Sequence, residues 1–369
     1  MKVAILENNQ PGFIKPMAAG LQKMLSKLEV QADIFPNGLA MLNSGLVYSL
    51  KNSLKNIAKS SINLIHPQYF LIQKNVSCSE LKKFEAQIAH YDVLIVVCNI
   101  PDAFLANKLL LIEKIRTKLS IPIVLYQNYY LATRGNWSRK IFASRGFGLE
   151  RYDWYLAASV VSEYPLNNET HPFSLIGHDL RDSALFTGQK KSFKVLLDFN
   201  QKGFETYRQL QIQALNETQI EYTQLSGHYS YHEINKLYRQ HSVLFLSFRE
   251  SFGLPIVENQ LCGNYIFTPH KNWAPSHYIN KSLYTAGEGE LGSNFKVYDN
   301  ELDKLKKLLR ECKKQYPSKK IVTNFKLEYP DLYHGNLSEL KKFIDKLASG
   351  EINSTTHSAH QVLNADIVG

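Results

Sequence analysis

The chain of 369 residues has few cysteines and no long apolar run. Its four cysteines, Cys78, Cys98, Cys262 and Cys312, are scattered and form no C-x-x-C pair, which argues against a cysteine zinc site and a disulfide framework. No window approaches the ~20 apolar residues that a transmembrane helix needs. The N-terminus begins with a strand-like stretch and lacks a signal-peptide pattern, so we expect a cytoplasmic protein with reduced thiols.

Cofactor and metal motifs are also scarce. No G-x-G-x-x-G follows the first predicted strand, which excludes the dinucleotide fingerprint at that position. No D-x-D triad stands at a predicted strand end as a metal site. We therefore predict an activity that uses no metal and no bound cofactor.

The residues that are present can build sizeable cores. Hydrophobic residues make up 44% of the chain, and its length suits two domains of ordinary size. The net charge of +10 favours an anionic partner. Nucleotide-sugars, phospholipid surfaces and nucleic acid all satisfy that preference, so charge does not choose among them.

Strand-like and helical segments alternate in both halves of the sequence. In the first half the predicted strands are 2–6, 30–35, 93–97, 121–125 and 154–161, and the predicted helices are 15–28, 81–90, 104–119 and 138–147. In the second half the predicted strands are 193–197, 220–225, 243–246, 265–269 and 295–298, and the predicted helices include 204–215, 302–315 and 336–347. This alternation is typical of doubly wound α/β domains, which bind ligands at the carboxyl ends of parallel strands.

The stretch 244–263 carries the most specific signal. An apolar strand leads into a polar loop, and Pro255 then stands where a helix would begin. Helical spacing continues to Gly263, a natural C-terminal stop. Such a junction presents backbone N–H groups and a positive dipole end to an anion. Glu250 and Glu258 flank the junction, and their carboxylates can accept hydrogen bonds from sugar hydroxyls.

The pattern S-x-x-E-S-F-G-L-P-x-x-E, from Ser247 to Glu258, resembles the E-x7-E donor motif of retaining GT-B glycosyltransferases. It is most similar to glycosyltransferase family 4. The alternative is a βα junction of any doubly wound domain, with both glutamates solvated. The resemblance implies an α/β GT-B fold, in which two Rossmann-like domains face a cleft and a C-terminal helix crosses back to the first domain.

The resemblance also implies a division of the chain. Residues 1–186 would form an acceptor-binding domain and residues 187–335 a nucleotide-sugar-binding domain. Residues 336–348 would be the helix that returns to the first domain, and residues 349–369 a flexible tail.

Donor-site roles follow from the same family. Glu250 would bind the donor sugar hydroxyls as the catalytic residue, and Glu258 the ribose hydroxyls. The backbone N–H groups of Phe252, Gly253 and Leu254 would face the phosphates, and Ser251 is a further donor-binding residue. Lys202 matches the lysine that neutralises the donor diphosphate in the family.

Two positions depart from the family pattern. Leu197 stands where the family has an arginine, and the loss of one cation beside a diphosphate should cost about 1–3 kcal/mol. Arg249 is a candidate substitute for that cation. Gly12 is a weak match to a glycine pair that faces the phosphates in the family. Tyr229 is either a base-stacking aromatic residue or an ordinary loop residue.

The acceptor side is less specific. The hinge-like segment Ile176-Gly177-His178-Asp179 has a histidine where the family usually has valine, so His178 is a hinge or cleft candidate. Asn128 follows a predicted strand and is a weak acceptor-side candidate. The basic, aromatic stretch 134–151 fits a solvated face or a phosphate-binding acceptor patch better than a nucleic-acid site, and we expect no nucleic-acid partner.

Residues 45–66 have an apolar helical stripe with lysines beside it. They predict either a helix packed on the domain surface or an amphipathic helix in peripheral contact with an anionic membrane.

Together these features predict a retaining, metal-independent glycosyltransferase. It would move a sugar from a nucleotide-sugar donor to a glycan or lipid-linked glycan, in the cytoplasm or at the membrane surface. The alternatives are a catalytically silent GT-B subunit that binds a sugar or a partner, and a nucleotide-sugar 2-epimerase.

Overall fold

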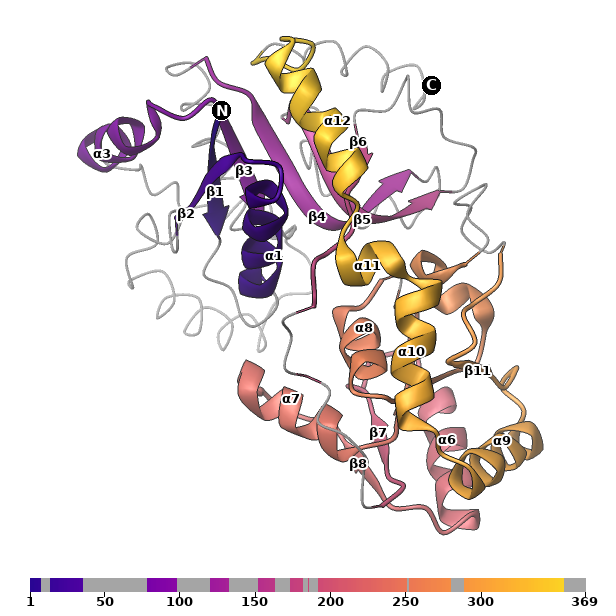
Figure 1. Cartoon of the computed structure of the whole chain (residues 1–369). Coiled ribbons are helices and arrows are strands. Elements are labelled where there is room, and N and C mark those ends of the chain that lie inside the picture. The colour runs from indigo at the N-terminus through magenta and orange to yellow at the C-terminus, as the bar shows by residue number, and fades with distance from the viewer. Residues whose placement is uncertain are drawn as a thin grey trace, which may run out of the picture.

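The computed structural model describes residues 1–7, 14–35, 78–97, 120–132, 152–162, 173–181, 185, 192–250, 252–279 and 289–354. Within these ranges the chain forms two separate parallel sheets, each flanked by helices (Figure 1). The first sheet has six strands and the second has five.

The first sheet has the order β2-β1-β3-β4-β5-β6. Its strands are β1 (Lys2–Glu7), β2 (Gln31–Phe35), β3 (Val93–Val97), β4 (Ile123–Ala132), β5 (Trp154–Ser162) and β6 (Phe173–Leu175). The central strands are continuous apolar runs because a parallel sheet is covered on both faces. Helices α1 (Ile14–Ser26) and α3 (Cys78–Ile88) belong to this part of the chain.

The second sheet has the order β11-β10-β9-β7-β8. Its strands are β7 (Val195–Leu197), β8 (Tyr222–Gln224), β9 (Val243–Phe245), β10 (Tyr265–Thr268) and β11 (Phe295–Val297). The helices around it are α6 (Glu205–Glu217), α7 (Tyr231–Gln240), α8 (Leu254–Leu261) and α9 (Leu302–Lys314), and two 3-10 turns, η4 (Lys271–Trp273) and η5 (Pro275–His277), follow β10.

The strand order of the second sheet reverses between β7 and β9. From β7 the chain passes to β8 on one side, and β9 then pairs on the other side of β7. The chain therefore leaves β7 and β9 toward opposite sides, which makes the carboxyl ends of these two strands the switch point of the sheet. In doubly wound sheets such a switch point is where ligands bind.

Three further helices end the described chain: α10 (Ser318–Glu328), α11 (Pro330–His334) and α12 (Leu337–Ala348). Figure 1 shows α12 lying over the first sheet, away from the sheet that precedes it in sequence. Helix α12 contacts β6 and α1, and its Leu340 and Phe343 are fully buried in a core shared with both sheets. The C-terminal helix thus crosses back, as the sequence predicts.

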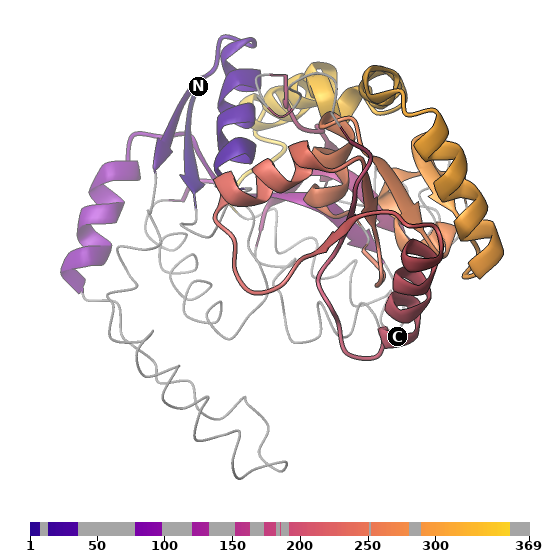
Figure 2. The same ribbon diagram turned by 90° about the horizontal axis from the view of Figure 1, so that it is seen from below.

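The first and second sheets approach each other along α1 and α7, which lie near one another when the molecule is seen from below (Figure 2). A hydrogen bond also joins the two parts, from Ser159 Oγ of β5 to the carbonyl oxygen of Ser276 in η5 (3.0 Å). An isolated bridge pairs Asp179 with His334.

Several boundaries differ from the sequence prediction. Strand β4 was expected to end near residue 125 but continues to Ala132, because Tyr129 to Ala132 pair with Ser159 to Ser162 of β5. Asn128 therefore lies within the strand. Strand β6 and helices α10 and α11 were not predicted, since each is short or has no strong apolar period.

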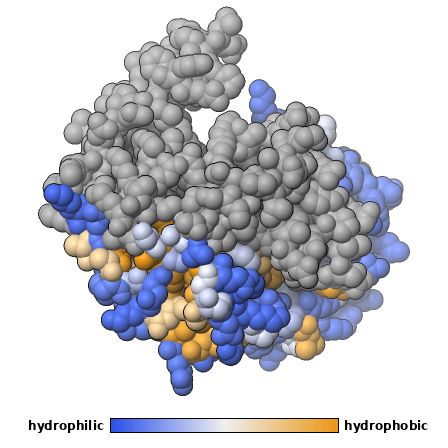
Figure 3. Space-filling model, turned by 90° about the horizontal axis from the view of Figure 1, so that it is seen from above, coloured by the Kyte–Doolittle hydropathy of each residue, from blue (hydrophilic) through white to orange (hydrophobic). Residues whose placement is uncertain are grey.

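Other predictions fall outside the described residues: the helices at 45–66, 104–119 and 138–147, the basic stretch 134–151, and the tail beyond residue 354. No helix among the described residues is long and apolar enough to cross a membrane. Seen from above (Figure 3), the described surface is largely hydrophilic, and hydrophobic residues show only in small groups.

Candidate functional site

Asp198 marks the carboxyl end of β7 and is tied to the neighbouring strand. Its carboxylate accepts hydrogen bonds from the Ser247 N–H (2.9 Å) and the Ser247 hydroxyl, so the ends of β7 and β9 are joined at the switch point. Arg208 of α6 donates from Nη2 to Asp198 and to Ser247 Oγ (2.7 Å). Burial raises the pKa of Asp198 to about 6, although Arg208 and the bonds from Ser247 oppose that rise.

Glu250 lies half-buried in the loop between β9 and α8. Burial, and secondarily the charge of Asp198, raises the pKa of this carboxyl to about 7. The next turn depends on Gly253, whose φ of +51° favours glycine. A Cβ on Gly253 would meet Glu250 Cγ at 2.4 Å, so the missing side chain leaves room for the Glu250 side chain to pack against the start of α8.

Helix α8 begins at Leu254 with Pro255 in its first turn and ends before Gly263, as the sequence predicts. Glu258 lies in its second turn and is only 7% exposed. Burial raises the pKa of this carboxyl to about 7 as well. The Tyr231 side chain at the start of α7 is hydrogen-bonded to Glu258 and also to Asn235 one turn further along α7.

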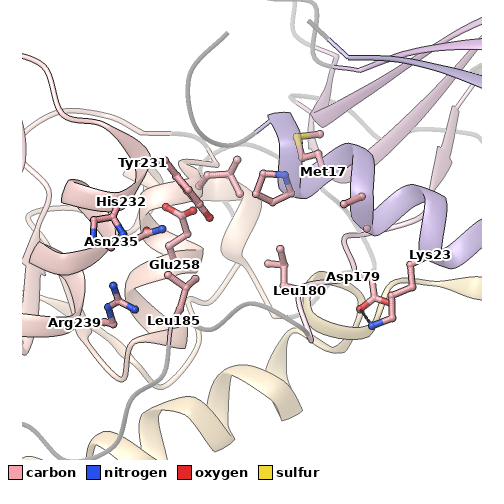
Figure 4. A pocket seen from close by; sticks show the side chains of 14 residues that line it. Met17, Lys23, Asp179, Leu180, Leu185, Tyr231, His232, Asn235, Arg239 and Glu258 are labelled. Atoms are coloured by element: carbon pink, nitrogen blue, oxygen red, sulfur yellow. Dashed lines mark ion pairs between the residues drawn. The ribbon is translucent and has the colours of Figure 1, made fainter. Parts of the chain in front are cut away.

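Glu258 faces a cavity of about 470 Å³ between α1, α7 and α8, which we call the α1–α7 cavity (Figure 4). Tyr231, Asn235 and Glu258 gather on one side of it, and Met17 and Lys23 of α1 lie on the other. The cavity is therefore shared between the two parts of the molecule. Its wall is mainly apolar with a few converging polar groups, the character of small-molecule sites.

The predicted phosphate-binding residues take different positions. Lys202 is exposed in the loop after β7, and Arg249 is half-buried in the loop after β9. Leu197 is fully buried within β7, a position that does not suit a cation. Phe252 and Leu254 are buried on either side of Gly253. Ser251 and Gly12 lie outside the described residues.

Arg208 is a buried cation at the switch point that sequence reasoning missed. It lies on α6, apart from any motif, and only the turn of that helix brings its guanidinium under the strand ends. Tyr231 and Asn235 were missed for the same reason. A weak signal existed for this part of α7, because Ser230 and Glu233 have the capping-box spacing, and the structure contains that box.

His178 is buried and its protonation can be assigned from its partners. The Tyr126 hydroxyl donates to the Gly177 carbonyl oxygen (2.7 Å), which can only accept. Tyr126 has one proton, so its 2.6 Å contact with His178 Nδ1 requires the histidine to donate from Nδ1. Nε2 then carries a lone pair, and it has no hydrogen-bond partner among the described residues. Burial lowers the pKa of His178 to about 3, so the ring is neutral.

His178 also contacts the donor loop predicted from sequence. Its ring meets Phe252 edge-on, with 5.8 Å between centroids, and His277 stacks on Phe252 at 5.5 Å. The Phe252 ring is thus held between a histidine of each part of the molecule. Asn128 is half-buried on β4, with its Oδ1 unpartnered among the described residues.

Potential metal ligands do not converge in the described ranges. No group of three or more His, Cys, Asp or Glu side chains there could hold a metal ion. Tyr229 is half-buried, and its ring lies 6.2 Å from that of Phe199.

Two parallel sheets covered by helices, with a C-terminal helix that returns to the first, are typical of the GT-B class, and the chain has this fold. The chain matches no protein-family model and no curated protein sequence. The solved structures that it matches include enzymes with the GT-B fold.

An α-glucosyltransferase in complex with UDP-glucose and DNA containing an abasic site is similar, with a TM-score of 0.51 and 12% identity over 94% of this chain and 98% of that chain. The α-glucosyltransferase in complex with UDP and a 13-mer DNA with an A:G mismatch has a TM-score of 0.51 and 11% identity over 94% and 100%. UDP-GlcNAc 2-epimerase from Neisseria meningitidis has a TM-score of 0.47 and 11% identity over 95% of this chain and 100% of that chain. At such identities the similarity shows the fold alone.

Proposed function

We propose that this protein is a glycosyltransferase of the family 4 type, which moves a sugar from a nucleotide-sugar to an acceptor with retention of configuration. The observation that carries the proposal is the position of the E-x7-E pair. Glu250 lies in the loop that follows β9 at the switch point and Glu258 faces the α1–α7 cavity, with the start of α8 between them. If the diphosphate binds at that helix start, Glu250 is placed on the side of the donor sugar and Glu258 on the side of the ribose.

The donor that we propose first is a UDP-sugar, because the similar α-glucosyltransferase structures contain UDP or UDP-glucose. Glu258 would bind the ribose hydroxyls and Glu250 the sugar hydroxyls. The backbone N–H group of Leu254, assisted by Lys202, would stabilise the leaving nucleoside diphosphate without a metal. The Gly253 N–H group already donates to the Glu250 carboxylate. Arg208 would contribute indirectly, because its hydrogen bonds hold Asp198 and Ser247 in place.

Same-face attack accounts for retention. The bond between the anomeric carbon and the phosphate oxygen breaks as the acceptor hydroxyl oxygen bonds to that carbon. The leaving phosphate oxygen accepts the proton of the hydroxyl, so no protein base is needed. Asn128 and His178 lie on the acceptor side in this proposal, and the neutral His178 would orient a hydroxyl rather than take its proton. A glycan or lipid-linked glycan is the proposed acceptor.

The first test is donor turnover. Purified protein is incubated with UDP-glucose, UDP-GlcNAc and other common nucleotide-sugars, with and without EDTA. The released nucleoside diphosphate is measured. We expect one donor to be hydrolysed at an EDTA-insensitive rate. Glu258→Ala should weaken donor binding by about 10–100-fold, because a group that receives hydroxyl hydrogen bonds is lost.

Glu311→Ala is the matched control, since Glu311 is exposed on α9. Failure of the unmodified protein to bind or hydrolyse any donor would overturn the enzyme proposal and leave the silent GT-B subunit. Conversion of UDP-GlcNAc to its 2-epimer would favour the epimerase. Where an acceptor is found, NMR of the product should show the anomeric configuration of the donor.

Acceptor candidates are then added to the best donor. Oligosaccharides and lipid-linked glycans are expected to act as acceptors. DNA is included because the similar α-glucosyltransferase structures are complexes with DNA. Transfer of the sugar to DNA and to no other acceptor would contradict the expected absence of a nucleic-acid partner.

A further inference from the structure

The walls of the α1–α7 cavity come from both parts of the molecule. Helix α1 contributes Pro16, Met17, Ala19 and Gly20, and Leu180 and Leu185 add further apolar surface. The cavity thus combines apolar surface with the Glu258 carboxylate and other polar groups. Its total volume of about 470 Å³ is large enough for a nucleoside.

The amide of Asn235 is oriented by its neighbours. The Tyr231 hydroxyl is hydrogen-bonded to Glu258, and above pH 7, where Glu258 is ionised, its carboxylate can only accept. Tyr231 has a single proton and donates it to Glu258, so the bond between Tyr231 and Asn235 must be donated by the asparagine Nδ2. The other amide atom, Oδ1, is consequently an acceptor.

That acceptor is not used within the described protein. Asn235 is only 8% exposed, and its Oδ1 has no hydrogen-bond partner there. A buried amide oxygen without a partner is costly, and native structures rarely leave one. Because Asn235 lines the α1–α7 cavity, a ligand in the cavity can supply the missing donor.

We propose that Asn235 is the base-reading residue of the donor site, and that its Oδ1 accepts a hydrogen bond from N3–H of uracil in a UDP-sugar. This inference rests on the proposed function, in which Glu258 holds the ribose. The base is the next group along the nucleotide, and Asn235 lines the same side of the cavity as Glu258 (Figure 4). The uracil ring lies between α7 and the apolar face of α1 around Met17.

The test compares UDP with 3-methyl-UDP, in which a methyl group replaces the N3 hydrogen. Binding of both to the unmodified protein, Asn235→Ala and Asn216→Ala is measured by calorimetry. Asn216 is exposed near the end of α6 and is the matched control. We expect the unmodified protein and Asn216→Ala to bind UDP about 10–100-fold more tightly than 3-methyl-UDP. In Asn235→Ala the ratio of the two affinities should fall below about threefold. UDP then lacks the hydrogen bond to Asn235 Oδ1 that 3-methyl-UDP cannot form with the unmodified protein.

Each contrary outcome has a separate meaning. If the unmodified protein binds UDP and 3-methyl-UDP equally, Asn235 does not read the base and the site is filled by water, although donor binding stands. A methyl penalty that persists in Asn235→Ala is steric and also overturns the inference. If UDP does not bind at all, the UDP-sugar proposal itself fails. Should Asn235→Ala not fold, Asn235→Asp, which keeps the acceptor, must retain the UDP preference.

Discussion

Glu258 is a carboxylate placed where ionisation is unfavourable. It is almost fully buried, and the hydrogen bond from Tyr231 compensates only part of the lost hydration, so its pKa rises to about 7. Glu250 has a pKa raised to about 7 for the same main reason. Two carboxylates that resist ionisation in the free protein suit a site whose ligand supplies the hydroxyl groups that stabilise the charge.

Replacement of Glu258 by glutamine should therefore stabilise the free protein at high pH. Between the ordinary pKa of 4.5 and the folded value of about 7, the folded state holds a proton that the unfolded state has lost. Folding stability then falls as pH rises through this window. Glu258→Gln should raise the free energy of unfolding by about 1–3 kcal/mol at pH 8 and leave it nearly unchanged at pH 4.5.

Denaturant unfolding at both pH values provides the measurement. Glu311→Gln, on the exposed face of α9, should show no such pH-dependent difference. An equal effect of Glu258→Gln at pH 4.5 and pH 8 would mean that packing rather than charge is responsible.

At the scale of elements, the start of α8 depends on a single glycine. Gly253 has a positive φ and lies against Glu250, so the backbone turn and the placement of the carboxylate are coupled. Helix α7 enters the same site with a capping box at Ser230, which fixes the position of Tyr231. The two helix starts together orient the carboxylates.

Gly253→Ala should damage donor binding more than it damages stability. An alanine at φ +51° is strained by about 1 kcal/mol, and its Cβ would also displace Glu250, whose Cγ would lie 2.4 Å away. We expect donor affinity to fall about tenfold or more, measured by calorimetry beside thermal unfolding. Gly350→Ala is the control, because Gly350 has φ +77° but no atom within 4 Å of the place that an alanine Cβ would occupy.

A fall in stability equal in both glycine variants, with no loss of donor binding by Gly253→Ala, would remove Gly253 from the site.

At the scale of the whole molecule, the two sheets are held together by the C-terminal helices as well as by the hinge. Helix α12 follows the second sheet in sequence yet packs on β6 and α1. Asp179 of the hinge segment also pairs with Lys27, the residue that follows α1 (2.9 Å), and with Arg181. The position of α1, and with it one wall of the α1–α7 cavity, therefore depends on residues near the C-terminus.

Phe343→Ala should destabilise the protein strongly. The ring is fully buried, and removal of a buried phenylalanine typically costs about 3–5 kcal/mol. The thermal midpoint should fall by roughly 10 °C, read by circular dichroism. Lys342→Ala, at the exposed neighbouring position, should change it by no more than about 2 °C. Similar midpoints for the two variants would show that α12 is dispensable for the first sheet.

Much of the architecture was predictable from local pattern. Apolar runs of four or five residues identify β1, β3 and β9, since a strand covered on both faces needs no polar alternation. Pro255 and Gly263 mark the limits of α8. Glu250 and Glu258 could be singled out because a short motif holds all the residues of one junction. Strand β6 and α11 escaped prediction because three to five residues carry too little periodicity.

The sequence by itself determined that parallel sheets would form. It also determined where one helix N-terminus suited to binding an anion would lie, because both properties depend on residues close together in the chain. Only the tertiary structure decided that Arg208 reaches Asp198 and Ser247, that Tyr231 links Asn235 to Glu258, and that α1 closes the cavity. These contacts join residues from different elements. Their geometry depends on how helices pack on two sheets and on each other, which no local pattern specifies.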